Sequence, residues 1–129
     1  MRAMRTFVGR LRRDEAGSSA VEFVLILIPM VMLTIGAINL SLMVYTVANL
    51  NYAAEDAARC NAVKKTTCTN AATTNTYGRA RYKGPGVPTF TATSPACGSR
   101  VVGTVPYVFT TGLTSTTFTL SSQACYPAT

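Results

Sequence analysis

The sequence predicts an α+β protein: a long N-terminal membrane-spanning helix followed by a small, disulfide-linked antiparallel β cap. Three features support this prediction: an apolar run from Phe23 to Ala48, four cysteines that all follow it, and alternating apolar residues near the C-terminus. We therefore expect a basic cytoplasmic leader over residues 1–17, a long helix over residues 18–60, and an extracytoplasmic cap over residues 61–129.

The apolar run is the strongest of these features because its 26 residues contain no charge. At about 1.5 Å per residue it would measure roughly 39 Å, which exceeds a hydrocarbon core of about 30 Å. A core helix of a soluble protein would show a polar face, and a signal peptide would have a shorter apolar region. We expect this run to span a membrane and to leave it near Tyr45. Pro29 should kink the helix at about the preceding turn.

Charge sets the expected orientation. Five arginines precede Gly17, and arginines beside a membrane span hold that end in the cytoplasm. The formal charge of +7 also raises the question of nucleic acid, but the basic residues are not interleaved with aromatic ones. We expect a single-pass protein with a cytoplasmic N-terminus and no nucleic-acid partner.

Glu22 stands at the head of the apolar run, where a carboxylate is costly unless it is paired, protonated or able to reach the interface. One interpretation is that it lies at the interface near the start of a helix that Ser18 caps. The other is that cleavage after Gly17 gives Ser18 a free amine, which neutralises Glu22 of a neighbouring subunit. The sequence leaves both open.

The residues around Glu22 carry a resemblance to a known family. Gly17, four small or apolar residues, Glu22 and Phe23 resemble the prepilin peptidase site of type IV pilin-like proteins. Roughly residues 12–60 resemble the TadE-like family of the tight-adherence (Flp) pilus system. The chain departs from that pattern at Asn39 and at Glu55-Asp56. The matching residues are Ala20-Val21-Glu22-Phe23, Ile28-Pro29, Gly36, Tyr45, Leu50, Ala53-Ala54 and Ala57-Ala58-Arg59.

The resemblance implies a pseudopilin or minor pilin of the bacterial inner membrane, with a pilin-like fold and a periplasmic C-terminal domain. It implies processing between Gly17 and Ser18 by a prepilin peptidase, and assembly through Glu22 and Phe23. The implied partners are inner-membrane lipid, the peptidase, other pilin or pseudopilin subunits, and the pilus assembly machinery. The alternative is an uncleaved anchor that displays a small surface-binding or adhesive domain. Incorporation into a surface pilus is left open.

The four cysteines predict two disulfides in an oxidising compartment. Three pairings are possible, and we favour Cys60–Cys68 and Cys97–Cys125. Residues 60 and 68 would lie about 12 Å apart in one helix, so the helix must break near residues 64–67. A zinc site is disfavoured because the spacing is wrong and histidine is absent, and we expect no metal and no cofactor.

The remaining segments fit a small cap. An apolar face formed by Leu50, Ala53, Ala54, Ala57 and Ala58 should dock on it. Residues 70–82 are ambiguous, because their spacing fits a short helix while their threonines argue against one.

Three strands are expected around Phe90, over 101–109 and over 118–126, with a turn near Gly112. Simple pairing about that turn puts Val101 and Val105 on the face opposite Leu120. We therefore expect a one-residue bulge at Gly103 or Pro106, and a disulfide bridge across the two strands.

The sequence offers no catalytic constellation. Histidine is absent, and no carboxylate follows Asp56, so the serines and threonines lack an activating partner. We expect the protein not to be an enzyme.

Overall fold

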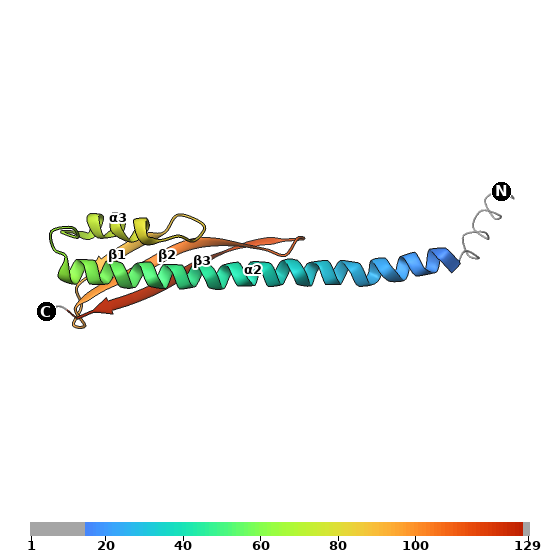
Figure 1. Ribbon diagram of the computed structural model, residues 1–129, viewed down its shortest axis with the longest axis horizontal. Helices are drawn as coiled ribbons and strands as arrows, with labels where there is room; N and C mark the ends of the chain where they lie inside the picture. The colour runs from blue at the N-terminus through green and yellow to red at the C-terminus, as the bar shows by residue number, and fades with distance from the viewer. Residues whose placement is uncertain (1–14, 128–129) are drawn as a thin grey trace.

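The computed structural model describes residues 15–127, so the predicted arginine-rich leader lies outside the described residues except for its last three positions. The chain forms a rod, with the smaller elements packed along the C-terminal half of one long helix (Figure 1). The predicted α+β architecture is confirmed. The elements are α2 (Glu15–Val63), α3 (Ala71–Arg81), β1 (Thr89–Thr93), β2 (Ser99–Thr110) and β3 (Ser115–Tyr126).

Helix α2 is 49 residues long, which corresponds to about 73 Å. It begins at Glu15, three residues before the expected start, so Ser18 lies inside the helix and is not its N-cap. It ends at Val63, where the Cys60–Cys68 disulfide required a break. The chain turns there through hydrogen bonds from the Lys64 and Cys68 amides to the carbonyls of Cys60 and Lys64.

The ambiguous segment is a helix, α3. Asn70 and Thr73 form a reciprocal cap in which each side chain accepts a hydrogen bond from the other residue's amide, at 2.9 and 3.0 Å. The hydroxyls of Thr74 and Thr76 donate to carbonyls four residues earlier. Threonine weighs against a helix by propensity, but the cap at Asn70 satisfies the first orphan amides.

The sheet is antiparallel, with strand order β1-β2-β3. Strands β2 and β3 pair continuously from Ser99↔Tyr126 to Thr110↔Ser115, so the expected bulge was wrong. The connecting loop is closed by a 3.0 Å hydrogen bond from the Thr111 amide to the Thr114 carbonyl. This turn is centred between residues 112 and 113, which shifts the register by one residue and places Val105 opposite Leu120. Gly112 adopts φ 92°, which favours glycine.

Pro106 shows why no bulge is needed. Strand β1 pairs with β2 only as far as Thr89↔Thr104, so Pro106 lies in a part of β2 that has a neighbour on one side alone. A proline is tolerated on such an edge because no ladder partner needs its missing N–H.

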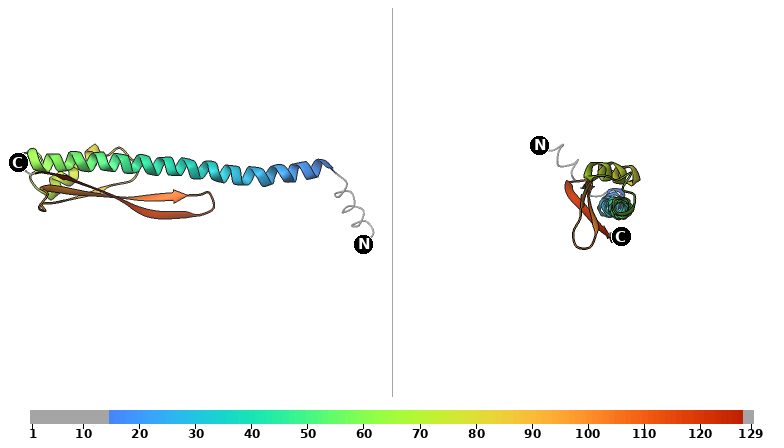
Figure 2. Two further views of the ribbon diagram at one scale, coloured as in Figure 1. Left: turned by 90° about the horizontal axis from the view of Figure 1, so that it is seen from below. Right: turned by 90° about the vertical axis from the view of Figure 1, so that its left-hand side faces the viewer.

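The core forms where α2 meets the sheet and α3. Seen along the axis of α2, α3 and the sheet lie on different sides of the helix (Figure 2). The expected docking face of α2 is fully buried, since Leu50 and Ala53 are 0% exposed. Phe90 packs between two glycines: a Cβ on Gly78 would lie 2.8 Å from its ring, and one on Gly103 2.7 Å. The buried apolar cluster comprises Leu50, Ala53, Ala54, Ala57, Ala58, Tyr82, Phe90, Val101, Val105, Tyr107 and Leu120.

Both favoured disulfides are present. Cys60–Cys68 closes the turn after α2, with Cα atoms 5.8 Å apart, and Cys97–Cys125 has Cα atoms 6.3 Å apart. The second is not the expected bridge between strands, because Cys97 precedes β2 in the loop after β1. Cys125 lies on β3 opposite Arg100. The bond therefore fastens the β1–β2 loop to the end of β3.

Candidate functional site

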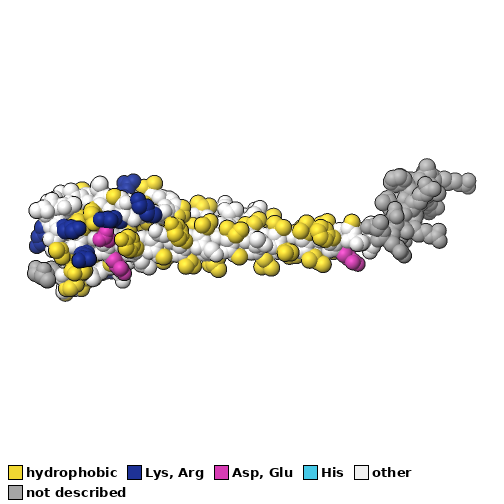
Figure 3. Space-filling model, viewed as in Figure 1, with side chains coloured by type: hydrophobic (Ala, Val, Ile, Leu, Met, Phe, Trp, Pro, Cys, Tyr) yellow, Lys and Arg dark blue, Asp and Glu magenta, His cyan; other side chains and the backbone are white. Residues whose placement is uncertain are grey.

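The N-terminal half of α2, from Gly17 to Val31, has no buried side chain, and we call it the bare half. Every side chain from Gly17 to Val31 is exposed, and this part of the rod presents apolar side chains without basic ones (Figure 3). Exposed apolar surface costs about 25 cal/mol per Å², so a helix this apolar needs lipid or another chain around it. The exposed large apolar residues of this half are Val21, Phe23, Val24, Leu25, Ile26, Leu27, Ile28, Met30, Val31 and Leu33.

By length and composition α2 can cross a membrane, and its most apolar window, of mean hydropathy 2.5, is not buried within the protein. Its polar side chains are satisfied by the helix itself, which lowers the cost of placing them in lipid. Each donates to the carbonyl four residues earlier: Thr34 at 2.8 Å, Asn39 at 3.0 Å, Ser41 at 3.0 Å and Thr46 at 2.7 Å.

Glu22 lies on the bare half with its side chain exposed. The ion pair among residues 15–127 is Arg81–Asp56, so no described residue neutralises Glu22. Gly17 and Ser18 lie in the first turn of α2, and Ser18 is four residues before Glu22 on the same helix face. Phe23, beside it, is 64% exposed. The predicted processing and assembly residues thus lie within about two exposed turns at the start of α2.

Pro29 lies inside α2, and the helix continues through it unbroken (Figure 1). Proline removes one backbone hydrogen bond, so the carbonyl of Leu25 lacks its helical donor. The kink expected at this position stays a prediction.

The cap reaches further down α2 than expected. The Tyr107 hydroxyl donates to the Asn39 carbonyl at 2.8 Å, and a Cβ on Gly112 would lie 3.5 Å from Ile35 Cδ1. The β2–β3 hairpin therefore contacts the helix from Ile35 onward, well before Tyr45. Sequence reasoning missed this contact, although the absence of any charge after Arg100 was a signal for it.

At the other end of the cap, polar contacts hold α3 to α2. Arg81 Nε lies 3.0 Å from Asp56 Oδ2, and the Tyr77 hydroxyl donates to the same oxygen at 3.3 Å. The Tyr77 hydroxyl and, less strongly, the Asp56 carboxylate raise the pKa of Arg81 above its usual value. The basic side chains on the visible face in Figure 3 gather around this end of the rod.

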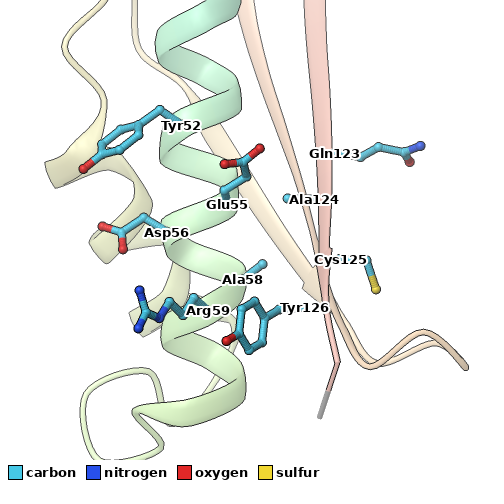
Figure 4. Close-up of a pocket in the computed structure, with 9 residues that line it drawn as sticks. All are labelled: Tyr52, Glu55, Asp56, Ala58, Arg59, Gln123, Ala124, Cys125 and Tyr126. Carbon is cyan, nitrogen blue, oxygen red and sulfur yellow. The ribbon is translucent and has the colours of Figure 1, made fainter.

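An open groove of about 510 Å³ lies between the C-terminal part of α2 and the end of β3. Figure 4 shows Glu55 of α2 and Tyr126 of β3 facing this space, and Arg59 also lines it. Carboxylate, guanidinium and phenol groups at an open surface suit polar contact with a partner. The residues that line the groove are Tyr52, Glu55, Asp56, Ala58, Arg59, Gln123, Ala124, Cys125 and Tyr126.

The segment of α2 that contains the bare half and the docking face matches the model of a known sequence family. The family model described as TadE-like protein matches residues 17–59. This segment is TadE-like. The match confirms the resemblance predicted from the sequence, and it indicates involvement in the tight-adherence pilus system, with protein partners from that system. Comparison with curated proteins and with solved structures gave no match.

The TadE-like segment stops just before the first disulfide. It includes Gly17, Ser18, Glu22 and the alanine-rich docking face, while α3 and the sheet lie outside it. The family match therefore covers most of the helix, and only the structure describes the cap.

Proposed function

We propose that this protein is a pseudopilin or minor pilin that takes part in assembly of a tight-adherence pilus from the bacterial inner membrane. One observation carries the proposal: an exposed apolar half-helix bears a carboxylate that no described residue neutralises, one turn after a Gly–Ser bond. Membrane lipid covers this half-helix before assembly, and the corresponding helices of other subunits cover it afterwards. The cap stays in the periplasm, where its disulfides form.

The carboxylate gives assembly its register. A prepilin peptidase cuts between Gly17 and Ser18, and the new ammonium group of one subunit pairs with Glu22 of its neighbour. An unpaired charge in hydrocarbon is strongly unfavourable, so helices that pack one turn out of register are disfavoured. The exposed Phe23 then contributes apolar contact beside the pair.

Substitution of the carboxylate tests this role. In the pilus-forming host, Glu22→Gln should insert into the membrane at the normal level and fail to enter filaments. The matched control is Glu55→Gln, because Glu55 is also an exposed carboxylate on α2 but lies over the cap. Sheared filaments and membranes are compared by immunoblotting. Normal incorporation of the Glu22→Gln protein would rule out the pairing.

The N-terminus tests processing separately. Intact mass spectrometry of the membrane-extracted chain should show a protein that begins at Ser18. A retained leader would instead favour the second candidate, an uncleaved anchor that displays the cap. The polar groove between α2 and β3 gives that candidate a surface for contact with a partner.

A further inference from the structure

The β2–β3 hairpin combines three properties that neither membrane anchoring nor subunit pairing requires. It points along α2 toward the bare half (Figure 1), its tip has no charged residue, and the apolar Leu113 at the tip is exposed. From these we propose that the hairpin tip inserts into the membrane leaflet on the cap side, with Leu113 among the lipid acyl chains. This inference rests on the proposed membrane anchoring of α2.

Depth along the helix supports the proposal. Ile35, which contacts the tip, lies 13 residues after Glu22, or about 20 Å along the axis. A hydrocarbon core of about 30 Å that begins near Glu22 extends about 10 Å past Ile35. Tilt of the helix would place Ile35 deeper still. The tip therefore lies at the depth of acyl chains and not in the periplasm.

The chemistry of the tip fits that environment. Leu113 is 76% exposed and has no cover among the residues that the structure describes. Together with α2 the tip forms a groove of about 260 Å³, whose lining is apolar except for Thr111. The groove residues are Leu27, Ile28, Val31, Met32, Ile35, Thr111, Gly112 and Leu113.

One backbone amide and one hydroxyl of the turn, both from Thr111, are satisfied within it. The Thr111 amide and hydroxyl both donate to the Thr114 carbonyl, at 3.0 and 3.3 Å, and the two threonine hydroxyls lie 3.3 Å apart. Unpaired polar groups are costly in hydrocarbon, so internal pairing lowers the cost of insertion. The nearest charged residue before the hairpin tip is Arg100, at the opposite end of β2.

The absence of tryptophan from the chain allows a direct test. Three single-tryptophan variants of the full chain, Leu113→Trp, Val63→Trp and Leu25→Trp, are reconstituted in phosphatidylcholine vesicles with or without brominated acyl chains. All three positions are exposed aliphatic residues, at 76%, 56% and 66%, so the cap should fold in each variant. Val63, at the far end of α2, is the aqueous control, and Leu25 reports on the anchor.

We expect brominated lipid to reduce the emission of Leu113→Trp and Leu25→Trp, and acrylamide in the buffer to reduce that of Val63→Trp. The proposal is overturned if Leu113→Trp behaves like Val63→Trp while Leu25→Trp is quenched by lipid, because the anchor would then insert without the hairpin. It is also overturned if neither quencher reaches Leu113→Trp and its shielding grows with the protein-to-lipid ratio, since a second copy would then cover the tip. Loss of lipid quenching at Leu25→Trp would show that the anchoring itself has failed.

Discussion

Both halves of α2 contain few charged residues, but their side chains suit different surroundings. The N-terminal half carries large apolar residues on all sides and is bare, whereas the C-terminal half buries alanines and Leu50 against the cap. Small residues let the sheet approach the helix closely, and the exposed polar side chains of Asn51, Glu55 and Arg59 lie beside this contact. Side-chain size and polarity therefore distinguish the covered half from the bare one.

Truncation of one leucine in each half should give the largest difference in the free energy of unfolding between the two halves. Leu50→Ala should lower the free energy of unfolding of the cap by about 2–5 kcal/mol, because it leaves a cavity in a fully buried site. Leu25→Ala should change it by less than about 0.5 kcal/mol, since Leu25 touches no part of the cap. Urea unfolding in micelles, followed by near-ultraviolet circular dichroism, measures both. Equal losses would mean that the halves are not independent.

The disulfides stabilise only the covered half, and their loops differ in length. Replacement of Cys97 and Cys125 by alanine should cost about 2–4 kcal/mol, and about 1 kcal/mol more than replacement of Cys60 and Cys68, because the first pair closes the longer loop. The sequence separations are 28 and 8 residues. The same urea titration without reductant ranks the two variants. A reversed order would show that the turn after α2 matters more than closure of the sheet.

The glycines sharpen the comparison on a smaller scale. Gly103→Ala should cost about 1–3 kcal/mol, because its Cβ would lie 2.7 Å from the Phe90 ring and 3.1 Å from Leu50. Gly36→Ala meets nothing within 4 Å and should stabilise α2 by up to about 1 kcal/mol. Thermal unfolding of both variants provides the measurement. A stable Gly103→Ala protein would indicate that the sheet can shift away from α2.

Tyr82 gives the smallest expected effect. Burial raises the pKa of this phenol, with a lesser contribution from Tyr45, and its hydroxyl donates to the Pro85 carbonyl at 2.6 Å. The phenol of the unfolded chain ionises first as pH rises above about 10, so the stability that Tyr82 contributes is complete below that pH and is lost above it.

Tyr82→Phe should lose about 1 kcal/mol at neutral pH and show a weaker alkaline decline. Tyr52→Phe, at an exposed site on α2, is the matched control and should leave both unchanged. Unfolding titrations at neutral pH and above pH 10 are compared. An alkaline decline of the same size in the Tyr82→Phe protein would exclude this phenol as its source.

Much of this architecture follows from local patterns in the sequence. The apolar run, the alternation around Val105 and Leu120, and the need to break a helix between Cys60 and Cys68 each depend on a single element or turn. The register of β2 and β3 could not be predicted, because it depends on a hydrogen bond across the Thr111–Thr114 loop. The helix of residues 71–81 depended on a cap at Asn70 that outweighs threonine propensity.

The candidate site could also be predicted only in part from the sequence. The sequence indicated Gly17, Ser18 and Glu22 because a charge beside an apolar run is conspicuous. It gave no indication that Tyr107 binds the Asn39 carbonyl, since those residues are 68 positions apart and meet only through the length of the hairpin.

Hydrogen–deuterium exchange of the full chain in lipid vesicles tests the central claim most directly, because it reads both halves of α2 at once. We predict slow exchange of amides in residues 20–34, where lipid excludes water, and equally slow exchange in residues 50–58, where the cap does so. Fast exchange over residues 20–34 beside a protected cap would show that the bare half lies in water, and would contradict the account.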